Sequence, residues 1–303
     1  MLEHVVEFVN KIISYGGFKR SEFSNKAYAS LLTSVEEISK HDLVMISSLI
    51  KRYKNVRGKL IIDTTDNPKY GLKDVAIKMK NLSNGGYRKG FKIVLFLYKM
   101  EDKTIPLGFA LIYKGSKKLE ALVLKALSIL RNTYKLKPQI VLADVGFSTQ
   151  EIIKRLNNYG YGFVIKGKRT YSLDKKQIKK QIPRGYGSKI GKLNNGVKVN
   201  TIRRKNRVFI TNRVSLTSEE VLQYYGERWK IEEVFRVLKS CMGLNRCQQH
   251  SIKAQALYTF GCLTAYSILE TIKTSSIYQA FASVILGDIV IDNSIIERLF
   301  VMT

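Results

Sequence analysis

The sequence is poor in acidic residues, cysteine and proline, and it lacks an apolar run long enough to cross a bilayer. Among 303 residues, 24 are Asp or Glu, three are Cys and four are Pro. The longest apolar stretch, 254–272, is interrupted by polar residues such as Gln255 and Glu270, which excludes a free-standing membrane span. The first residues lack the basic and apolar regions of a signal peptide. We therefore expect a cytoplasmic protein without membrane contact.

The small number of cysteines excludes a disulfide framework. Their number is odd, and Cys241, Cys247 and His250 do not have the spacing of a zinc finger. We expect reduced, partly buried thiols, as in cytosolic proteins.

What the sequence has in excess is positive charge. Lys and Arg number 52, so the formal net charge is +28, and the pI is near 9.9. A protein with such an excess repels itself unless a polyanion is nearby, which indicates nucleic acid or an anionic membrane surface as a partner. An aromatic content of 10% and the absence of a long single-charge block exclude a disordered polybasic tail.

This charge is concentrated in one part of the chain. Residues 1–58 carry a net charge of only +3, whereas residues 151–215 contain eighteen basic and two acidic residues. The same segment contains strand-like apolar pieces and turn signals, which predict a folded β-rich unit with a basic face along phosphates. The alternatives are a solvated basic surface or a ribosomal-type RNA binder. Candidates for contacts to the DNA backbone are Lys166, Lys168, Arg169, Arg203, Arg204, Lys205 and Arg207.

The apolar pattern predicts an α/β fold. Residues 1–57 are expected to form a helical N-terminal segment, and residues 64–90 a polar connection. Strands are expected at 59–62, 91–98, 105–113, 138–143 and 161–166, and helices at 117–134, from Ser148 to Gly160 and from Thr217 to Lys239. The order β-β-β-α-β-α-β-α is that of a ribonuclease H-like core with a mixed sheet and helices on both faces. This ribonuclease H-like domain would span 58–273, with a basic β-rich insertion at 167–215 before its last helix, followed by a C-terminal helical element at 274–303.

Two of the expected strands end on an aspartate. Asp63 closes Leu-Ile-Ile-Asp, and Asp144 closes Ile-Val-Leu-Ala-Asp. In open α/β sheets, ligands bind at the edge beyond the strand ends. Each Asp alone often starts a turn, but two of them in a chain so short of acid indicate a site.

The long helix supplies a third carboxylate. Tyr225, Arg228, Glu232 and Lys239 are offset by three, four and seven residues, which places them on one helical face. Such a face is either solvated, with an Arg228–Glu232 pair, or a phosphate-binding stripe around a metal ligand. Trp229, next to this stripe, is expected to have a packing role.

These residues resemble a known family. Tyr-x2-Arg-x3-Glu-x6-Lys is similar to the signature helix of transposases of insertion-sequence family 4, in the DDE superfamily. The Asp-Thr-Thr at Asp63 and the Ala-Asp-Val-Gly-Phe-Ser around Asp144 resemble its first and second acidic motifs, and the resemblance covers about 59–270. It implies that Asp63, Asp144 and Glu232 form the catalytic and metal-binding triad. It also implies that Tyr225, Arg228 and Lys239 hold transposon-end DNA, that 58–273 is the catalytic domain, and that the helical N-terminal segment 1–57 has a possible contact to DNA ends.

The expected chemistry is metal-dependent phosphodiester cleavage. Three carboxylates suit two Mg²⁺ ions, with Mn²⁺ as a substitute, and no small-molecule cofactor. The resemblance implies hydrolysis at the element ends and attack of the 3′-OH on target DNA. It further implies double-stranded element-end and target DNA as partners, a homodimer or larger synaptic complex, and a nucleoid-associated protein in a prokaryotic cytoplasm. The alternatives are a ribonuclease H-like nuclease without strand transfer and a catalytically inactive or domesticated DNA-binding derivative.

Overall fold

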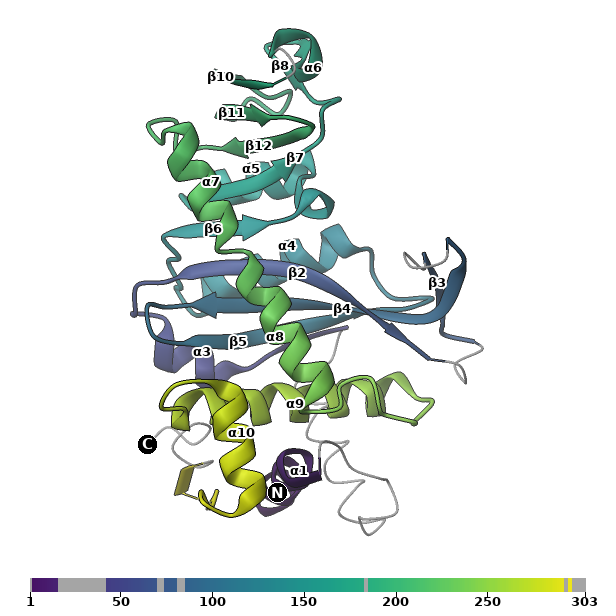
Figure 1. The fold of residues 1–303 in the computed structure, drawn as a ribbon. Helices are drawn as coiled ribbons and strands as arrows, with labels where there is room; N and C mark the ends of the chain where they lie inside the picture. The colour runs from purple at the N-terminus through teal and green to yellow at the C-terminus, as the bar shows by residue number, and fades with distance from the viewer. Residues whose placement is uncertain are drawn as a thin grey trace.

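The computed structural model describes residues 2–15, 42–69, 74–80, 85–182, 185–291 and 294–295 (Figure 1). The strands are β1 (Leu43–Met45), β2 (Lys59–Pro68), β3 (Ile77–Lys80), β4 (Tyr87–Lys99), β5 (Thr104–Ile112), β6 (Ile140–Ala143), β7 (Gly162–Gly167), β8 (Ser172–Leu173), β9 (Lys176–Gln177), β10 (Tyr186–Lys192), β11 (Lys198–Arg204) and β12 (Arg207–Thr211). The helices are α1 (Leu2–Tyr15), α3 (Ser47–Tyr53), α4 (Leu119–Ser128), η2 (Ile129–Thr133), η3 (Val145–Phe147), α5 (Gln150–Asn158), α6 (Ile178–Gln181), α7 (Ser218–Gly226), α8 (Trp229–Ser240), α9 (Ile252–Ile272) and α10 (Ile277–Leu286). Within these ranges, no helix has the length and apolar character needed to cross a membrane.

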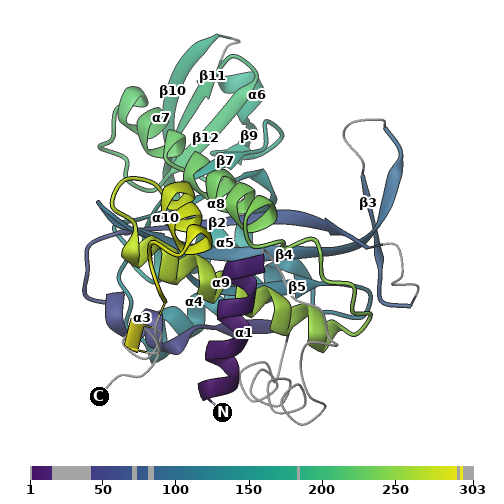
Figure 2. The same ribbon diagram turned by 60° about the horizontal axis from the view of Figure 1, so that its bottom comes forward.

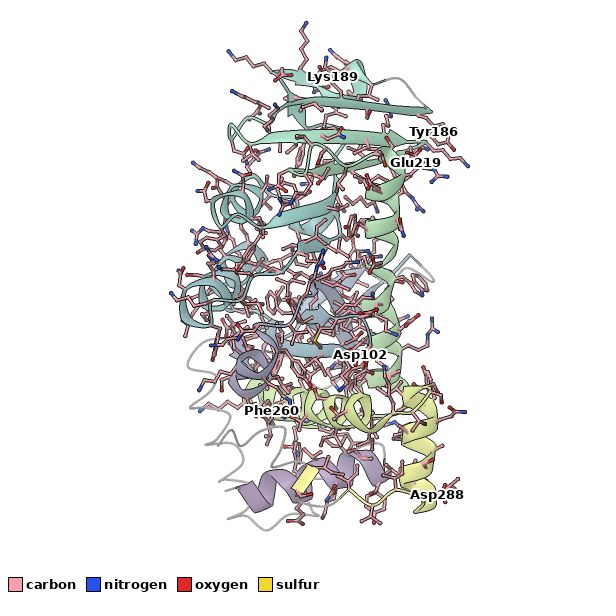
Figure 3. All side chains as sticks on the ribbon, turned by 90° about the vertical axis from the view of Figure 1, so that its left-hand side faces the viewer. Asp102, Tyr186, Lys189, Glu219, Phe260 and Asp288 are labelled. Atoms are coloured by element: carbon pink, nitrogen blue, oxygen red, sulfur yellow. The ribbon has the colours of Figure 1, made fainter. Side chains whose placement is uncertain are left out.

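The main sheet is mixed, as the sequence predicts. Its strand order is β1-β5-β4-β2-β6-β7-β12-β11-β10, with β3 added beside β4. The central strands β2, β6 and β7 are parallel, and the other pairings in the sheet are antiparallel. Helix α4 leads from β5 to β6 and α5 from β6 to β7, and both cover one face, while α7 and α8 cross the other (Figures 1 and 3). This arrangement is a ribonuclease H-like core.

The sheet is longer at both ends than the sequence predicts. Strand β2 continues to Pro68 along β4, and β3 pairs with the start of β4, so strands occupy much of the described part of the expected connection at 64–90. At the other end, β12 pairs with the free edge of β7, and β11 and β10 follow. The basic insertion is therefore β-rich, as expected, and continues the main sheet up to Tyr186 and Lys189 on β10 (Figure 3).

The N-terminal segment is only partly helical in its described part. α1 and α3 are helices, but β1 is a strand that pairs with β5 and extends the sheet. Residues 16–41 of the expected helical segment lie outside the described residues. α1 packs against α9 and α10 (Figure 2), and its buried side chains include Phe8 and Ile12.

A glycine allows the close contact between α1 and α9. A Cβ added at Gly261 would lie 2.1 Å from Cε1 of Phe8 and 2.6 Å from Cδ1 of Ile12. We expect Gly261→Ala to reduce the free energy of unfolding by about 1–3 kcal/mol, because an overpacked core shifts side chains and backbone. Urea denaturation measures this, with Gly226→Ala as the control, since a Cβ there meets no atom within 4 Å. Equal stability of the two variants would contradict the prediction.

Candidate active site

Three neighbouring strands bring charged residues to one edge of the core. Ile62 of β2, Ala143 of β6 and Ile165 of β7 are in register, and they are followed by Asp63, Asp144 and Lys166. The pairing of β2 with β6 stops at Ile62, so the next residues are free of a ladder partner on that side. Asp144 follows its strand, as predicted. Asp63, however, lies within β2, because β4 continues to pair with this strand up to Pro68.

The predicted long helix is two helices joined by a tight turn. α7 begins with the predicted capping box: the Thr217 hydroxyl accepts from the Glu220 backbone and the Glu220 carboxylate from the Thr217 backbone. After Gly226, the N–H of Arg228 donates to the carbonyl of Tyr225 at 3.0 Å, and Ile231 donates to Arg228 at 3.1 Å. These bonds span three residues rather than four, which tightens the turn. Arg228 and Glu232 nevertheless remain on the side that faces the sheet.

The Arg228 guanidinium joins two of the predicted catalytic carboxylates. Its two terminal nitrogens bond to Oδ2 of Asp63 and to Oε1 of Glu232. The side chain is 14% exposed, and its guanidinium carbon lies 5.5 Å from the ring centre of Tyr225. The i,i+4 pair weighed in the sequence is thus present, but it is part of a contact with the sheet rather than a solvated face.

Asp144 has a separate set of partners. Its Oδ1 accepts from the Tyr225 hydroxyl at 3.1 Å and lies 3.3 Å from Nζ of Lys166. Burial raises the pKa of Asp144, but the backbone N–H of Val145, Lys166 and the Tyr225 hydroxyl together bring this pKa below its usual value. Burial and the neighbouring carboxylate raise the pKa of Tyr225, so its hydroxyl keeps the proton that it donates. Asp144 is therefore ionised at neutral pH.

Asp63 is in a less favourable place for a charge. Burial raises the pKa of Asp63 to about 6, although the N–H of Thr64, at 2.7 Å, and Arg228 lower it. The nearby charges of Asp144 and Glu232 raise it further. This carboxyl group therefore gains or loses its proton close to neutral pH, and a cation placed beside it favours the ionised form.

Lys239 binds the strand that carries Asp63. Its Nζ donates to Oγ1 of Thr65 at 2.6 Å, two residues beyond Asp63 and on the same face of β2. Burial lowers the pKa of Lys239, and Asp66 partly opposes this effect. The four residues of the signature therefore all contact the sheet or each other near the two aspartates.

The basic residues predicted to contact DNA differ in position. Lys166 lies at the site, and Lys168, Arg169, Arg204, Lys205 and Arg207 are exposed on the insertion. Arg203 is a correction: it is 3% exposed and its guanidinium bonds to the carbonyls of Lys179 and Ile182, so it is buried inside the insertion. Trp229 is a second correction, because it is 53% exposed rather than packed in the core.

One residue near the site was not predicted from the sequence. Glu227, in the turn between α7 and α8, accepts from Nζ of Lys59 and from Nζ of Lys99 at 2.8 Å. The two lysines begin β2 and end β4, so this carboxylate ties the helix turn to the sheet. Helical periodicity places Glu227 away from the signature stripe, and no local pattern links it to lysines so far away in the sequence.

Glu227 is expected to stabilise the site through these bonds. Glu227→Gln leaves two lysines without their carboxylate, which we expect to cost about 1–3 kcal/mol in the free energy of unfolding. The lysines lower the pKa of Glu227 below its usual value despite burial, so its stabilisation is present above about pH 4.5 and is lost as the pH falls through the lowered pKa. Urea unfolding at pH 7 and pH 3.5 measures this. An unchanged difference at the two pH values would contradict it.

The donor set suits a hard divalent cation, but the carboxylates are not gathered around one. In the described part of the chain, no group of three or more His, Cys, Asp or Glu side chains stands close enough to hold a metal ion. The charge beside Asp63 and Glu232 is instead the Arg228 guanidinium. Oxygen ligands from Asp63, Asp144 and Glu232 are those that such ions prefer. The residues fit the ion chemically, provided that Arg228 leaves its place between two of them.

The sequence and fold define the class of this protein. Residues 54–268 match the family described as the transposase DDE domain. The match covers most of the chain, so the chain belongs to this family and is a DNA transposase of the DDE superfamily. Transposase DDE domains in general use divalent metal ions. No curated protein matches the chain.

Solved structures share the fold. A piggyBac transposase in a synaptic complex with hairpin DNA is similar over 99% of this chain and 76% of that one, with a TM-score of 0.51 and 12% identity. The Drosophila P element transposase strand transfer complex is matched over 93% of this chain and 63% of that one, with a TM-score of 0.29 and 10% identity. The catalytic domain of human endonuclease V is matched over 71% of this chain and 100% of that one, with a TM-score of 0.27 and 10% identity. The last two scores support no conclusion about this chain.

Proposed function

We propose that this chain is a transposase of the insertion-sequence 4 type, which cuts the ends of its own element and joins them to target DNA. Asp63, Asp144 and Glu232 are the proposed catalytic and metal-binding residues, with two Mg²⁺ ions, replaceable by Mn²⁺. The observation that supports this is that Asp63 and Asp144 directly follow Ile62 and Ala143, which are paired on adjacent parallel strands, while Arg228 of the signature helix bonds to both Asp63 and Glu232.

The chain's own residues have separate roles in this proposal. The bound ions would stabilise negative charge on the reacting phosphate as Lewis acids. Arg228 and Lys239 supply positive charges on the same face for the DNA backbone, and Tyr225 donates a hydrogen bond. Lys166 and the exposed basic residues of the insertion extend this contact. We further propose a homodimer or larger synaptic complex, at the nucleoid of a prokaryotic cell.

Cleavage and joining of a plasmid with the gene's own flanking DNA test this proposal. The reactions contain Mg²⁺, Mn²⁺ or EDTA, and compare the wild type with Glu232→Ala. The control is Glu233→Ala on the same helix, since Glu233 pairs with Lys230 at 2.7 Å and its side chain is 43% exposed. We expect metal-dependent cleavage and joined products that only Glu232→Ala loses.

Other outcomes support the alternatives. Nicking without joined products would indicate a ribonuclease H-like nuclease. Salt-sensitive DNA binding without cleavage in either metal would indicate an inactive or domesticated DNA-binding derivative. Equal activity of the two glutamate variants would remove Glu232 from the proposed site.

A further inference from the structure

The end of the sheet beyond Asp63 forms an arm that projects from the body of the molecule (Figures 1 and 2). We define the arm as the paired segments 77–80 of β3 and 87–90 of β4. Neither segment contains an acidic residue. The exposed side chains of the arm include Lys78, Lys80, Lys89 and Tyr87, of which the last is 74% exposed.

These four side chains share one face of the arm. Lys78 pairs with Lys89, and Lys80 pairs with Tyr87. Directly paired residues, and residues two apart on one strand, point to the same side of a sheet. Lysines opposite each other destabilise a strand pair, and none of the three lysines forms an ion pair with any other described residue. A row of like charges on a projecting arm therefore suits a polyanion as its partner.

This basic face continues the catalytic face of the sheet. On β2, every second residue from Asp63 to Asn67 lies on the catalytic face, opposite Leu95, Ile93 and Phe91 of β4. Continuing along β4 in steps of two, Lys89 and Tyr87 lie on this same face. Thr65 and Asn67 are covered by Lys239 and by the carbonyl of Leu244, and the arm begins beyond this cover. Asp63 lies opposite Leu95, and Tyr87 lies eight residues before Leu95 on β4. Eight residues of a strand span about 26 Å, which corresponds to about eight base pairs of duplex DNA.

We propose that the arm binds the backbone of the DNA whose reacting phosphate lies at the carboxylates, about eight base pairs from that phosphate. The three lysines contact phosphates, and the Tyr87 hydroxyl donates a hydrogen bond to one. This inference rests on the proposed function, because it needs DNA at Asp63. It adds a contact that sets the register of the DNA and lies outside the signature helix and the insertion.

The salt dependence of DNA binding tests the charges. The triple variant Lys78→Gln/Lys80→Gln/Lys89→Gln is compared with Lys118→Gln/Lys137→Gln/Lys154→Gln, which removes three exposed lysines outside the arm. Binding to a fluorescein-labelled 40-base-pair duplex is measured by anisotropy from 50 to 200 mM NaCl. We expect the slope of log K against log salt to fall by about three in the arm variant relative to the wild type. Equal slopes for the two variants would overturn the proposal.

A tethered cleavage reagent tests the position. The three native cysteines are buried, so an iron–EDTA reagent attached to Tyr87→Cys reacts mainly at the arm. On a duplex with the gene's flanking DNA, we expect strand scission about eight base pairs from the protein's own metal-dependent cut. Lys154→Cys, labelled in the same way, should give no scission there. Scission at the same place from both sites, or none from the arm, would overturn the proposal.

Two further outcomes separate this inference from its alternatives. If the arm variant loses self-association in light scattering while its salt slope is unchanged, the arm binds a second copy of the chain instead of DNA. If the wild type cleaves its flanking DNA but the arm variant has the same salt slope as the wild type, the proposed role of the arm is wrong and the proposed function stands. A wild-type protein that neither binds nor cleaves DNA overturns the proposed function as well.

Discussion

Asp63→Asn is expected to be inactive and, without metal, more stable than the wild type. Burial raises the pKa of Asp63 to about 6, so its charge opposes folding at neutral pH. Asn has nearly the same shape and carries no charge, which should add up to about 3 kcal/mol to the free energy of unfolding at pH 8. The same change removes a proposed metal ligand, and we expect DNA cleavage to fall at least about 10³-fold.

The pH dependence follows from the raised pKa. The protonated carboxyl is favoured in the folded state, so the wild type loses stability relative to Asp63→Asn as the pH rises from about 4 to about 6. Below this window the two proteins should be equally stable, and above it the difference should be constant. Urea unfolding in EDTA at pH 3.5, 5, 6.5 and 8 measures it.

The control is an aspartate on the same strand. Asp66 pairs with Lys92 at 3.3 Å and its side chain is 40% exposed. Asp66→Asn should change stability by less than about 1 kcal/mol at every pH. If the wild type and Asp63→Asn have the same free energy of unfolding at pH 8, burial does not destabilise the ionised form of Asp63.

Arg228→Ala is expected to change metal binding and DNA binding in opposite directions. In the free protein, the Arg228 guanidinium bonds to Asp63 and Glu232. Its removal leaves both carboxylates available to a divalent ion, and we expect Mn²⁺ to bind about tenfold more tightly, corresponding to about 1.4 kcal/mol. The loss of a cation from the DNA face should reduce the salt slope of DNA binding by about one.

Titration with Mn²⁺, followed by electron paramagnetic resonance, measures the first effect without DNA. Arg236→Ala is the control, because Arg236 is exposed on the same helix. It should leave the affinity for Mn²⁺ unchanged. If Arg228→Ala binds Mn²⁺ no better than Arg236→Ala, the guanidinium does not compete with the ion.

The neighbouring positions of Asp63 and Asp144 could be predicted because they depend on strong local patterns. Each aspartate follows a short, fully apolar run, and the antiparallel strands and the crossover helix between the two runs make their strands parallel. The signature helix is also clear, since its residues keep a helical period. The tight turn after Gly226 could not be predicted, because the signature residues keep the same helical period on both sides of it.

The arm and the buried arginine could not be predicted, for different reasons. Lys78 and Lys80 alternate with Ile77 and Met79 over only four residues, between turn-forming segments, and so short a polar strand has little apolar signal. Arg203 lies in a basic run that predicts a surface. It is buried because its carbonyl partners, at Lys179 and Ile182, come from a segment whose path over β11 has no sequence signature.

The continuity of the main sheet divides the site into a fixed half and a movable half. Asp63 and Lys166 lie in β2 and β7, and Asp144 directly follows β6, so all three are attached to neighbouring strands that backbone hydrogen bonds hold together up to Ile62, Ala143 and Ile165. Glu232 and Arg228 belong to α8, which is joined to α7 by a tight turn and held to the sheet by side chains. A step that gathers all three carboxylates therefore repositions Arg228 and Glu232 on α8, while the strands that carry the two aspartates stay in place.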